Sequence, residues 1–212
     1  RARNNEGVFF QAAEKATASS LNFFITHARG MMFLPCTEKR LSRLKIPMMS
    51  SDNNNVSNVG ALAVSIDARS ITGSGISARD RALTVKAFID QDTEPEDIII
   101  PGHIFPLRAS GGGVLERAGH TEAAVDLASI AGLYSAGIIS EVIKDDGEVA
   151  LLPDLIDISR DSGLKIVTIE ELIRYRKKKE KLIEKVAEIT LPTKWGDFRA
   201  ATYRSTISPE TH

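Results

Sequence analysis

Apolar residues recur at helical spacing in six stretches of the chain, and most of these stretches carry a residue that starts or ends a helix. Leu21, Phe24 and Ile25 show this pattern in the first stretch, and Gly30 follows as a stop signal. Ser77 is placed to cap the third helix through its hydroxyl group. The expected helices cover residues 12–29, 37–44, 78–90 and 121–131, a stretch opened by Pro153, and 169–188.

Shorter apolar runs between these helices predict strands. They are MMFLP at 31–35, ALAVSID at 61–67, IFPLRA at 104–109, GIISEVI at 137–143, KIVTI at 165–169 and the alternating stretch LPTKWGDFRAATYRS at 191–205. Residues 92–103 are expected to form an acidic, proline-marked connection, and KDDGE at 144–148 is typical of a hairpin turn. Strands and helices mix without a regular βαβ order, so the predicted class is α+β, or an irregular layered α/β sandwich.

The last quarter of the chain differs from the rest in its pattern. The final turns of the expected helix over 169–188 are mostly charged, and strand-like alternation follows them. We therefore expect a main domain over residues 1–176, a linker helix over 177–190 and the start of a second, truncated domain over 191–212. The chain begins at Arg1 without a targeting segment, so we expect it to be a piece of a longer protein.

Composition excludes several classes of protein. The 212 residues are 42% hydrophobic and 26% charged, as in ordinary globular proteins, and the net charge of −1 argues against a basic nucleic-acid binder. No apolar run approaches the roughly 20 residues that span a bilayer. We therefore expect neither nucleic acid nor membrane as a partner. Cys36 is the only cysteine, which excludes an intrachain disulfide and a thiolate zinc cluster and makes a reducing compartment the default.

The sequence RAGHT at 117–121 stands immediately before an expected helix. Arg117 offers a planar fork for a phosphate, and the helix N-terminus adds free N–H groups and the positive end of the helix dipole. His120 at the same point can ligate a metal ion. The alternative is an exposed loop in which Thr121 is only the N-cap of the helix.

Two further residues are candidates for acid or base chemistry. His103 follows a proline and a glycine, which would fix the backbone and aim the imidazole, although a solvated turn histidine is an alternative. Glu141 interrupts the apolar strand at 137–143. Burial there would raise the pKa of its carboxyl group and suit it to proton transfer, and the alternative is an outward-facing residue of an edge strand.

Weaker signals come from four other places. Glu6, in the polar turn NNEG, is either a ligand or a solvated loop residue, and His27 is expected to be structural. Cys36 at a helix start could have a lowered pKa, but a small buried residue is the simpler interpretation. The glycines at 111–113 lack the spacing of a phosphate-binding loop and predict only a flexible or tightly turned stretch.

Taken together, these segments resemble one enzyme family. IPGHIFPLRA, GGVLERAGHTEAAVDLASIAGL and GIISEVIKDDGE, in that order and spacing, are similar to 3,4-dihydroxy-2-butanone 4-phosphate synthases, and SGISARDRA and KIVTIEELIRYR fit the same pattern. The resemblance extends to about residue 180, and the residues that carry it are especially similar to those of plant sequences. The tail at 191–205 resembles the first strand of GTP cyclohydrolase II, which implies a fused riboflavin-biosynthesis parent in the plastid stroma of a plant, or otherwise in the cytoplasm.

The resemblance implies a fold, a reaction and roles for residues. The fold would be a layered α+β domain that works as a homodimer with its sites at the interface. The family converts ribulose 5-phosphate to the four-carbon phosphate and formate through an enediolate, using magnesium to neutralise developing oxyanions. By resemblance, His103 and Glu141 would be the acid/base residues and His120 a magnesium ligand. The residues that would hold substrate are Arg3, Arg117, His120 and Thr121.

The N-terminal loop departs from the family pattern. The family sequence is DRENEGD, whereas residues 2–8 read ARNNEGV. The metal-binding glutamate is replaced by Asn4, and the final aspartate, which contacts substrate, is replaced by Val8. A family cysteine falls at Phe33. Because magnesium prefers anionic oxygen ligands, Asn4 is a poor replacement, and Glu6 is the candidate substitute.

These replacements leave three hypotheses. The first is a synthase-fold domain that has lost most of its lyase activity and serves as a dimerising scaffold for a downstream GTP cyclohydrolase II domain. The second is an active magnesium-dependent synthase in which Glu6 and water replace the missing ligand. The third is a sugar-phosphate binder without turnover. Three altered groups at one centre favour the first hypothesis.

Overall fold

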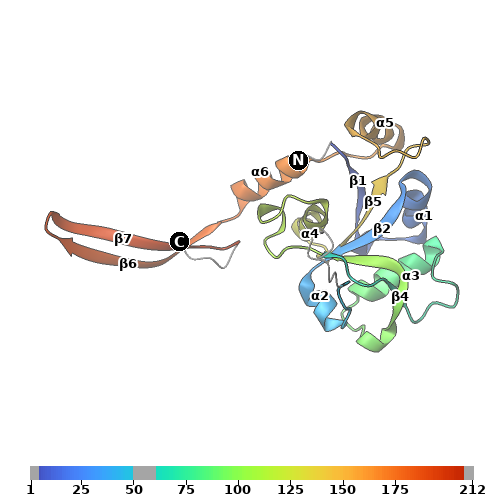
Figure 1. Cartoon of the computed structure of the whole chain (residues 1–212), viewed down its shortest axis with the longest axis horizontal. Coiled ribbons are helices and arrows are strands. Elements are labelled where there is room, and N and C mark those ends of the chain that lie inside the picture. Colours follow the sequence, from blue (N-terminus) through green and yellow to red (C-terminus); the bar gives the residue numbers. More distant parts are fainter. Residues whose placement is uncertain (1–4, 50–60, 208–212) are drawn as a thin grey trace.

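A computed structural model describes residues 5–49 and 61–207 of the chain. Its main body is a five-stranded sheet in the order β1-β5-β2-β4-β3, in which only the β2–β4 pair is parallel (Figure 1). The strands are β1 Val8–Ala12, β2 Arg29–Cys36, β3 Ile66–Ala68, β4 Ile98–Arg108 and β5 Gly137–Val142. The predicted α+β class is confirmed.

Helices cover both faces of this sheet (Figure 1). They are α1 Ala18–His27, α2 Glu38–Arg43, α3 Ala78–Ile89, α4 His120–Ile130, α5 Leu152–Ser162 and α6 Ile169–Lys179. Alternation along β5 separates the two faces: Ile138 and Val142 point into the large core beneath α1 and α3, whereas Ile139 lies on the side of α4. No helix in the described ranges is long and apolar enough to cross a membrane.

Local signals explain most helix ends. The Ser77 hydroxyl accepts a hydrogen bond from the backbone N–H of Asp80, as predicted for the start of α3. Thr37 occupies the N-cap position of α2, but its side chain makes no capping hydrogen bond. Gly132 follows α4 with a positive φ of 71°, as its role as a stop residue requires.

Several predicted elements either do not form or differ in extent from the structure. KIVTI at 165–169 forms no strand, because residues 164–168 are open coil between α5 and α6. Within 61–67, only the last two residues belong to β3. The acidic connection at 92–103 already becomes strand at Ile98, and β1 forms where no strand was predicted. Leu164, Ile166 and Val167 remain exposed, so this apolar run lacks the neighbouring strand that its pattern implied.

The expected helix over 169–188 ends at Lys179, so the expected linker helix over 177–190 is wrong beyond that residue. Residues Ile183–Thr193 form β6, which pairs antiparallel with β7, Gly196–Ser205. This two-stranded hairpin projects away from the body (Figure 1). The strand-like alternation predicted over 191–205 therefore describes the hairpin tip and its second strand.

Candidate functional site

The sequence RAGHT lies where the loop after β4 enters α4. Gly119 is the N-cap of α4, with extended φ and ψ of −127° and 158°, and His120 and Thr121 are the first two helical residues. The alternative interpretation, in which Thr121 caps the helix, is therefore wrong. Both side chains lie beside the N-terminus of an eleven-residue helix, whose free N–H groups and dipole favour an anion.

Four of the predicted site residues line one cavity of about 340 Å³. Arg117, His120 and Thr121 come from the entrance to α4, and Glu141 comes from β5. Buried Glu122 lines the same cavity, and apolar Val8 and Phe33 are among the other lining residues. The resemblance placed the lost aspartate and cysteine at these two apolar positions, and both now face the predicted site.

For Glu141, the prediction of burial is wrong, and the alternative of an outward-facing residue in an edge strand is right only in its exposure. Its side chain is exposed rather than buried, and β5 is an interior strand flanked by β1 and β2 rather than an edge strand. Glu141 lies on the α4 face of the sheet, and its partner in the β1–β5 register is Val8. Contact with the cavity, rather than burial, therefore makes Glu141 a candidate for chemistry.

His103 lies on β4 and is not among the residues that line this cavity. Its Nδ1 atom lies 2.7 Å from Asp67 Oδ2, and its backbone N–H donates to Asp67 Oδ1 at 3.0 Å. Gly75 packs against this pair with a φ of 87°, and a Cβ atom there would lie 2.6 Å from His103 Nδ1. Asp67 on β3 thus orients the His103 ring, Gly75 packs against it, and its role in acid or base chemistry stays a prediction.

Asp67 was not singled out in the sequence. It ends the alternating stretch ALAVSID, and a carboxylate at the end of an apolar strand was the available signal. Glu122 was also missed. It occupies the first turn of α4 with its side chain completely buried, and its Oε1 atom accepts a hydrogen bond from Ser110 N–H at 3.1 Å.

A second cavity, of about 580 Å³, shares His120 with the first and also contacts Glu6. Arg3 and Asn4 lie outside the described residues. Among the residues that are described, no group of three or more His, Cys, Asp or Glu side chains is placed to hold a metal ion. Magnesium commonly takes only one or two protein carboxylates and completes its shell with water and substrate oxygens.

The minor candidates are structural. Cys36 is buried, and this burial raises the pKa of its thiol above the ordinary value, which disfavours a reactive thiolate. The His27 ring packs against Phe23 with centroids 4.3 Å apart, as expected for a structural histidine.

Comparison with known proteins identifies the class. The sequence model of the 3,4-dihydroxy-2-butanone 4-phosphate synthase family matches residues 1–175, so the chain belongs to this family. It is 49% identical over 210 residues to the riboflavin biosynthesis protein RibBA of Aquifex aeolicus, covering 98% of this chain and 52% of that protein. It is 43% identical to the chloroplastic bifunctional riboflavin biosynthesis protein RIBA 1 of Arabidopsis thaliana, covering 99% of this chain and 39% of that protein.

Solved structures agree with this assignment. The two-domain synthase RibBX from A. baumannii superposes with a TM-score of 0.89 at 42% identity, covering 99% of this chain and 61% of that one. A synthase in complex with two magnesium ions superposes with a TM-score of 0.77 at 35% identity, covering 84% and 88% of the two chains. The chain thus spans about half the length of the curated relatives it matches.

Proposed function

We propose that this chain is the synthase-fold half of a riboflavin-biosynthesis protein whose own lyase chemistry is lost or strongly impaired. The observation that carries this proposal is the composition of the 340 Å³ cavity, where Val8 and Phe33 face His120 and Glu141. Neither apolar side chain can coordinate magnesium or accept a hydrogen bond from a sugar hydroxyl. Loss of one electrostatic group of this kind costs about 10²-fold or more in rate.

We expect the chain to retain binding of a sugar phosphate although its lyase turnover is lost. Arg117 and Thr121 lie at the N-terminus of α4 beside the same cavity, and an arginine at a helix N-terminus suits a phosphate group. The family substrate, ribulose 5-phosphate, is therefore the proposed ligand. Arg3 stays a predicted contributor to this grip.

The second candidate is an active, magnesium-dependent synthase. The observation in its favour is that Arg117, His120, Thr121 and Glu141 share one cavity, with Glu6 on the adjoining one. In this alternative, Glu6 and water would supply the ligands that Asn4 cannot. The relative solved with two magnesium ions makes magnesium the cation to test.

A homodimer is part of the proposal. Leu152, Ile156, Ile166 and Val167 are apolar and exposed, and all of them except Ile156 line the 580 Å³ cavity. A second copy of the chain would bury this surface and enclose the cavity that His120 and Glu6 share. We call the surface formed by these four residues the α5 patch.

We further propose that residues 191–212 begin a GTP cyclohydrolase II domain, with residues 1–176 as the synthase domain. Fused relatives are about twice as long as this chain, and the β6–β7 hairpin leaves its apolar side chains uncovered. The scaffold role follows if that domain carries the activity of the parent protein. Its compartment would be the plastid stroma in a plant and the cytoplasm elsewhere.

One experiment separates the candidates. Purified chain is given ribulose 5-phosphate with magnesium, and formate release is followed beside an ordinary synthase of the family. We expect turnover at least about 100-fold below that synthase. The triple reversion Asn4→Glu, Val8→Asp and Phe33→Cys should restore it.

The outcomes are distinct. Wild-type turnover equal to that of the ordinary synthase would overturn the hypothesis of lost lyase activity and establish that of an active synthase. Saturable binding of ribulose 5-phosphate by calorimetry, without formate, is the result that the impaired synthase with a retained phosphate grip predicts, and it would also support the third hypothesis, a sugar-phosphate binder. A reversion that stays inactive while it binds substrate would show that the defect lies outside these three positions.

A further inference from the structure

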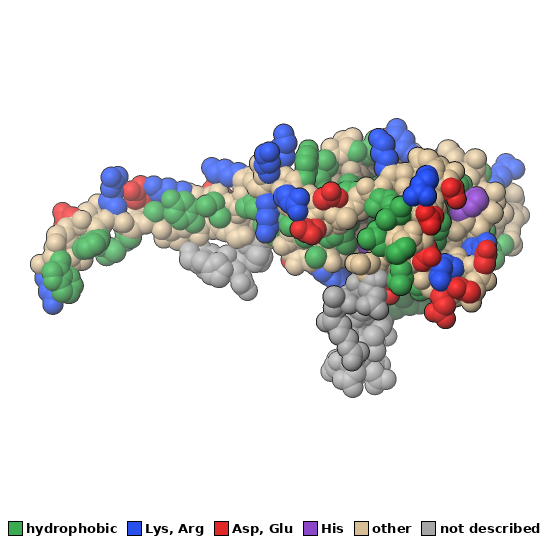
Figure 2. Space-filling model, turned by 90° about the horizontal axis from the view of Figure 1, so that it is seen from above, with side chains coloured by type: hydrophobic (Ala, Val, Ile, Leu, Met, Phe, Trp, Pro, Cys, Tyr) green, Lys and Arg blue, Asp and Glu red, His purple; other side chains and the backbone are tan. Residues whose placement is uncertain are grey.

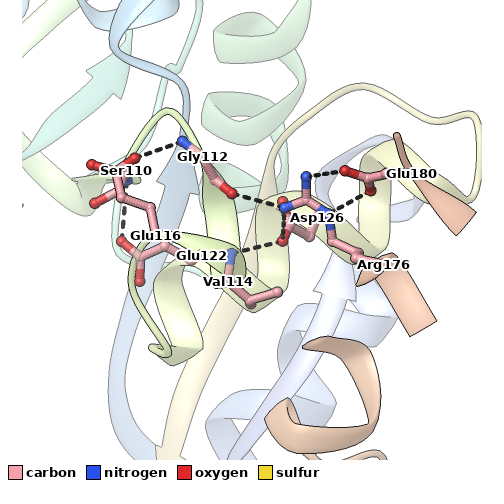
Figure 3. A network of polar contacts seen from close by, with 8 residues as sticks. All are labelled: Ser110, Gly112, Val114, Glu116, Glu122, Asp126, Arg176 and Glu180. Atoms are coloured by element: carbon pink, nitrogen blue, oxygen red, sulfur yellow. Dashed lines mark hydrogen bonds and ion pairs between the residues drawn. The ribbon is translucent and has the colours of Figure 1, made fainter. Parts of the chain in front are cut away.

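The glycine-containing loop at 110–117 leads from β4 to α4 and ends at Arg117. Its backbone is held by carboxylates rather than by a strand partner (Figure 3). Ser110 N–H donates to Glu122 Oε1 at 3.1 Å, and Val114 N–H donates to Asp126 Oδ2 at 2.8 Å. Of the two predictions for the glycine run, the tightly turned stretch is therefore the one that the structure supports.

The two anchoring carboxylates come from one helix face. Glu122 and Asp126 are one turn apart on α4, and both are buried. Glu122 Oε1 also lies 3.5 Å from Arg117 Nη1, while its Oε2 atom is buried without a hydrogen-bond partner. The helix that presents His120 and Thr121 thus also fixes the loop that presents Arg117.

Arg176 on α6 contacts both the loop and α4. Its Nη1 atom donates to Gly112 O at 2.9 Å and to Asp126 Oδ2 at 2.8 Å, so one guanidinium nitrogen joins loop and helix (Figure 3). Its Nε and Nη2 atoms bind the Glu180 carboxylate at 2.6 and 2.7 Å. The side chain is only 14% exposed, and its charge compensates buried Asp126.

Glycine at position 113 is required by this packing. Gly113 has a φ of 61°, and a Cβ atom there would lie 2.2 Å from Asp126 Oδ1 and 2.5 Å from Arg176 Nη1. Hydrogen bonds to Glu180, and then to Asp126, raise the pKa of Arg176, so the guanidinium stays charged. Loop, helix and guanidinium therefore fit as one unit.

We infer that Arg176 is a positioning residue for the phosphate grip. By bridging Gly112 O and Asp126, it holds the loop on α4 and thereby fixes where Arg117 presents its guanidinium to the phosphate of a sugar phosphate. The inference rests on the proposed function in one respect, namely that Arg117 binds that phosphate. Three residues separate α6 from β6, so this bridge also ties the start of the hairpin to the predicted site.

The expected loss of affinity follows from the fraction of molecules whose loop is correctly placed. The affinity for a ligand falls in proportion to the fraction of molecules whose loop is held in the binding arrangement. If loss of the bridge lowers that fraction to about a tenth, the Kd for the sugar phosphate rises about tenfold. The effect should appear in binding, because Arg176 itself does not line the cavity.

The test compares Arg176→Met, Arg176→Lys and a matched control, Glu180→Gln, in the whole chain. The control alters only the solvent-side partner of Arg176. Calorimetry gives the Kd for ribulose 5-phosphate and for inorganic phosphate, and amide hydrogen exchange reports the N–H groups of Val114 and Arg117. For Arg176→Met, we expect about a tenfold higher Kd and faster exchange at Val114. Arg176→Lys should recover part of both, and Glu180→Gln should change Kd less than about twofold.

Each remaining outcome decides a separate question. If the wild type binds and Arg176→Met binds equally well, the inference is wrong while the proposed function stands. If the wild type binds neither ligand, the proposed binding of a sugar phosphate fails; unchanged protection of Val114 in Arg176→Met would then overturn the anchoring as well. If Arg176→Met fails to fold, Arg176→Lys against Glu180→Gln provides the same comparison, and equal Kd values would contradict the inference.

Discussion

At the scale of single residues, Asp67 controls which nitrogen of His103 carries a proton. Asp67 Oδ1 accepts the His103 backbone N–H, so Oδ2 is left for the ring at 2.7 Å. A carboxylate can only accept, and Nδ1 must therefore donate. The Nε2 atom of a neutral ring is then left as an acceptor, which is the state that a general base requires.

Asp67→Asn should reverse this tautomer. The amide oxygen would keep the backbone hydrogen bond, so the NH₂ group would face Nδ1 and move the ring proton to Nε2. We expect the ¹⁵N shifts of the His103 ring to exchange between wild type and variant, with about 1 kcal/mol lost from the free energy of unfolding. Identical ring shifts in the two proteins would show that Asp67 does not set the tautomer.

Cys36 makes stability depend on pH on the alkaline side. Burial raises the pKa of its thiol above the ordinary value of 9.0, so the native state keeps a proton that the unfolded chain releases above about pH 9. The unfolded state then binds fewer protons, and stability falls as pH rises. We expect this thiol to contribute a loss of up to about 1.4 kcal/mol per pH unit between pH 9 and 11.

Urea unfolding at several pH values measures that slope. Cys36→Ala is the comparison, because it removes the titrating group and leaves every lysine and tyrosine in place. The difference in free energy of unfolding between the two proteins should shrink as pH rises from 9 to 11. Parallel curves over that range would show that the thiol does not couple to folding.

Some site residues could be predicted from the sequence and others could not. Arg117, His120 and Thr121 were identified because they stand together before a helix, where local chemistry suffices. Asp67 and Glu122 were missed because their roles come from contacts across 36 and 12 positions of the chain. Glu141 was predicted for a reason that the structure does not support, since contact with a cavity cannot be deduced from one strand alone.

At the scale of elements, hydroxyl caps contribute unequally to helix stability. Ser77 accepts a hydrogen bond from Asp80 N–H at the start of α3, whereas Thr37 at the start of α2 makes no such bond. Ser77→Ala should therefore lower the free energy of unfolding by about 1 kcal/mol. Thr37→Ala, the matched control, should change it by less than about 0.5 kcal/mol in the same urea experiment. Equal losses would contradict the role of the hydrogen bond.

Local pattern identified four of the six helices closely because capping and stop residues act within a turn. It failed at 165–169, where apolar alternation normally means a strand but no neighbouring strand is available. It failed again after Lys179, where charged residues of high helix propensity, among them Glu184 and Lys185, enter β6. There, pairing with β7 overrides local preference, and a single sequence window cannot report its partner.

At the scale of the whole molecule, two apolar surfaces formed by residues in 5–49 and 61–207 are exposed. One face of the hairpin pairs Leu191 with Phe198 and Ile189 with Ala200, and hydrophobic side chains follow the projection in Figure 2. Isolated two-stranded hairpins are marginally stable in water, so this face requires a cover, which the proposed downstream domain would supply. The other surface is the α5 patch, which we assign to a second copy of the chain.

The two assignments predict different effects of the same kind of substitution. Ile166→Glu places a charge in the α5 patch, where burial against a second copy would desolvate it, so the variant should be monomeric. Ile189→Glu, the matched control on the hairpin, exposes an equivalent side chain and should leave the dimer intact. Light scattering after size exclusion distinguishes the 23.1 kDa chain from twice that mass. A monomeric wild type would end the dimer proposal, and dissociation by Ile189→Glu alone would move the interface from the α5 patch to the hairpin.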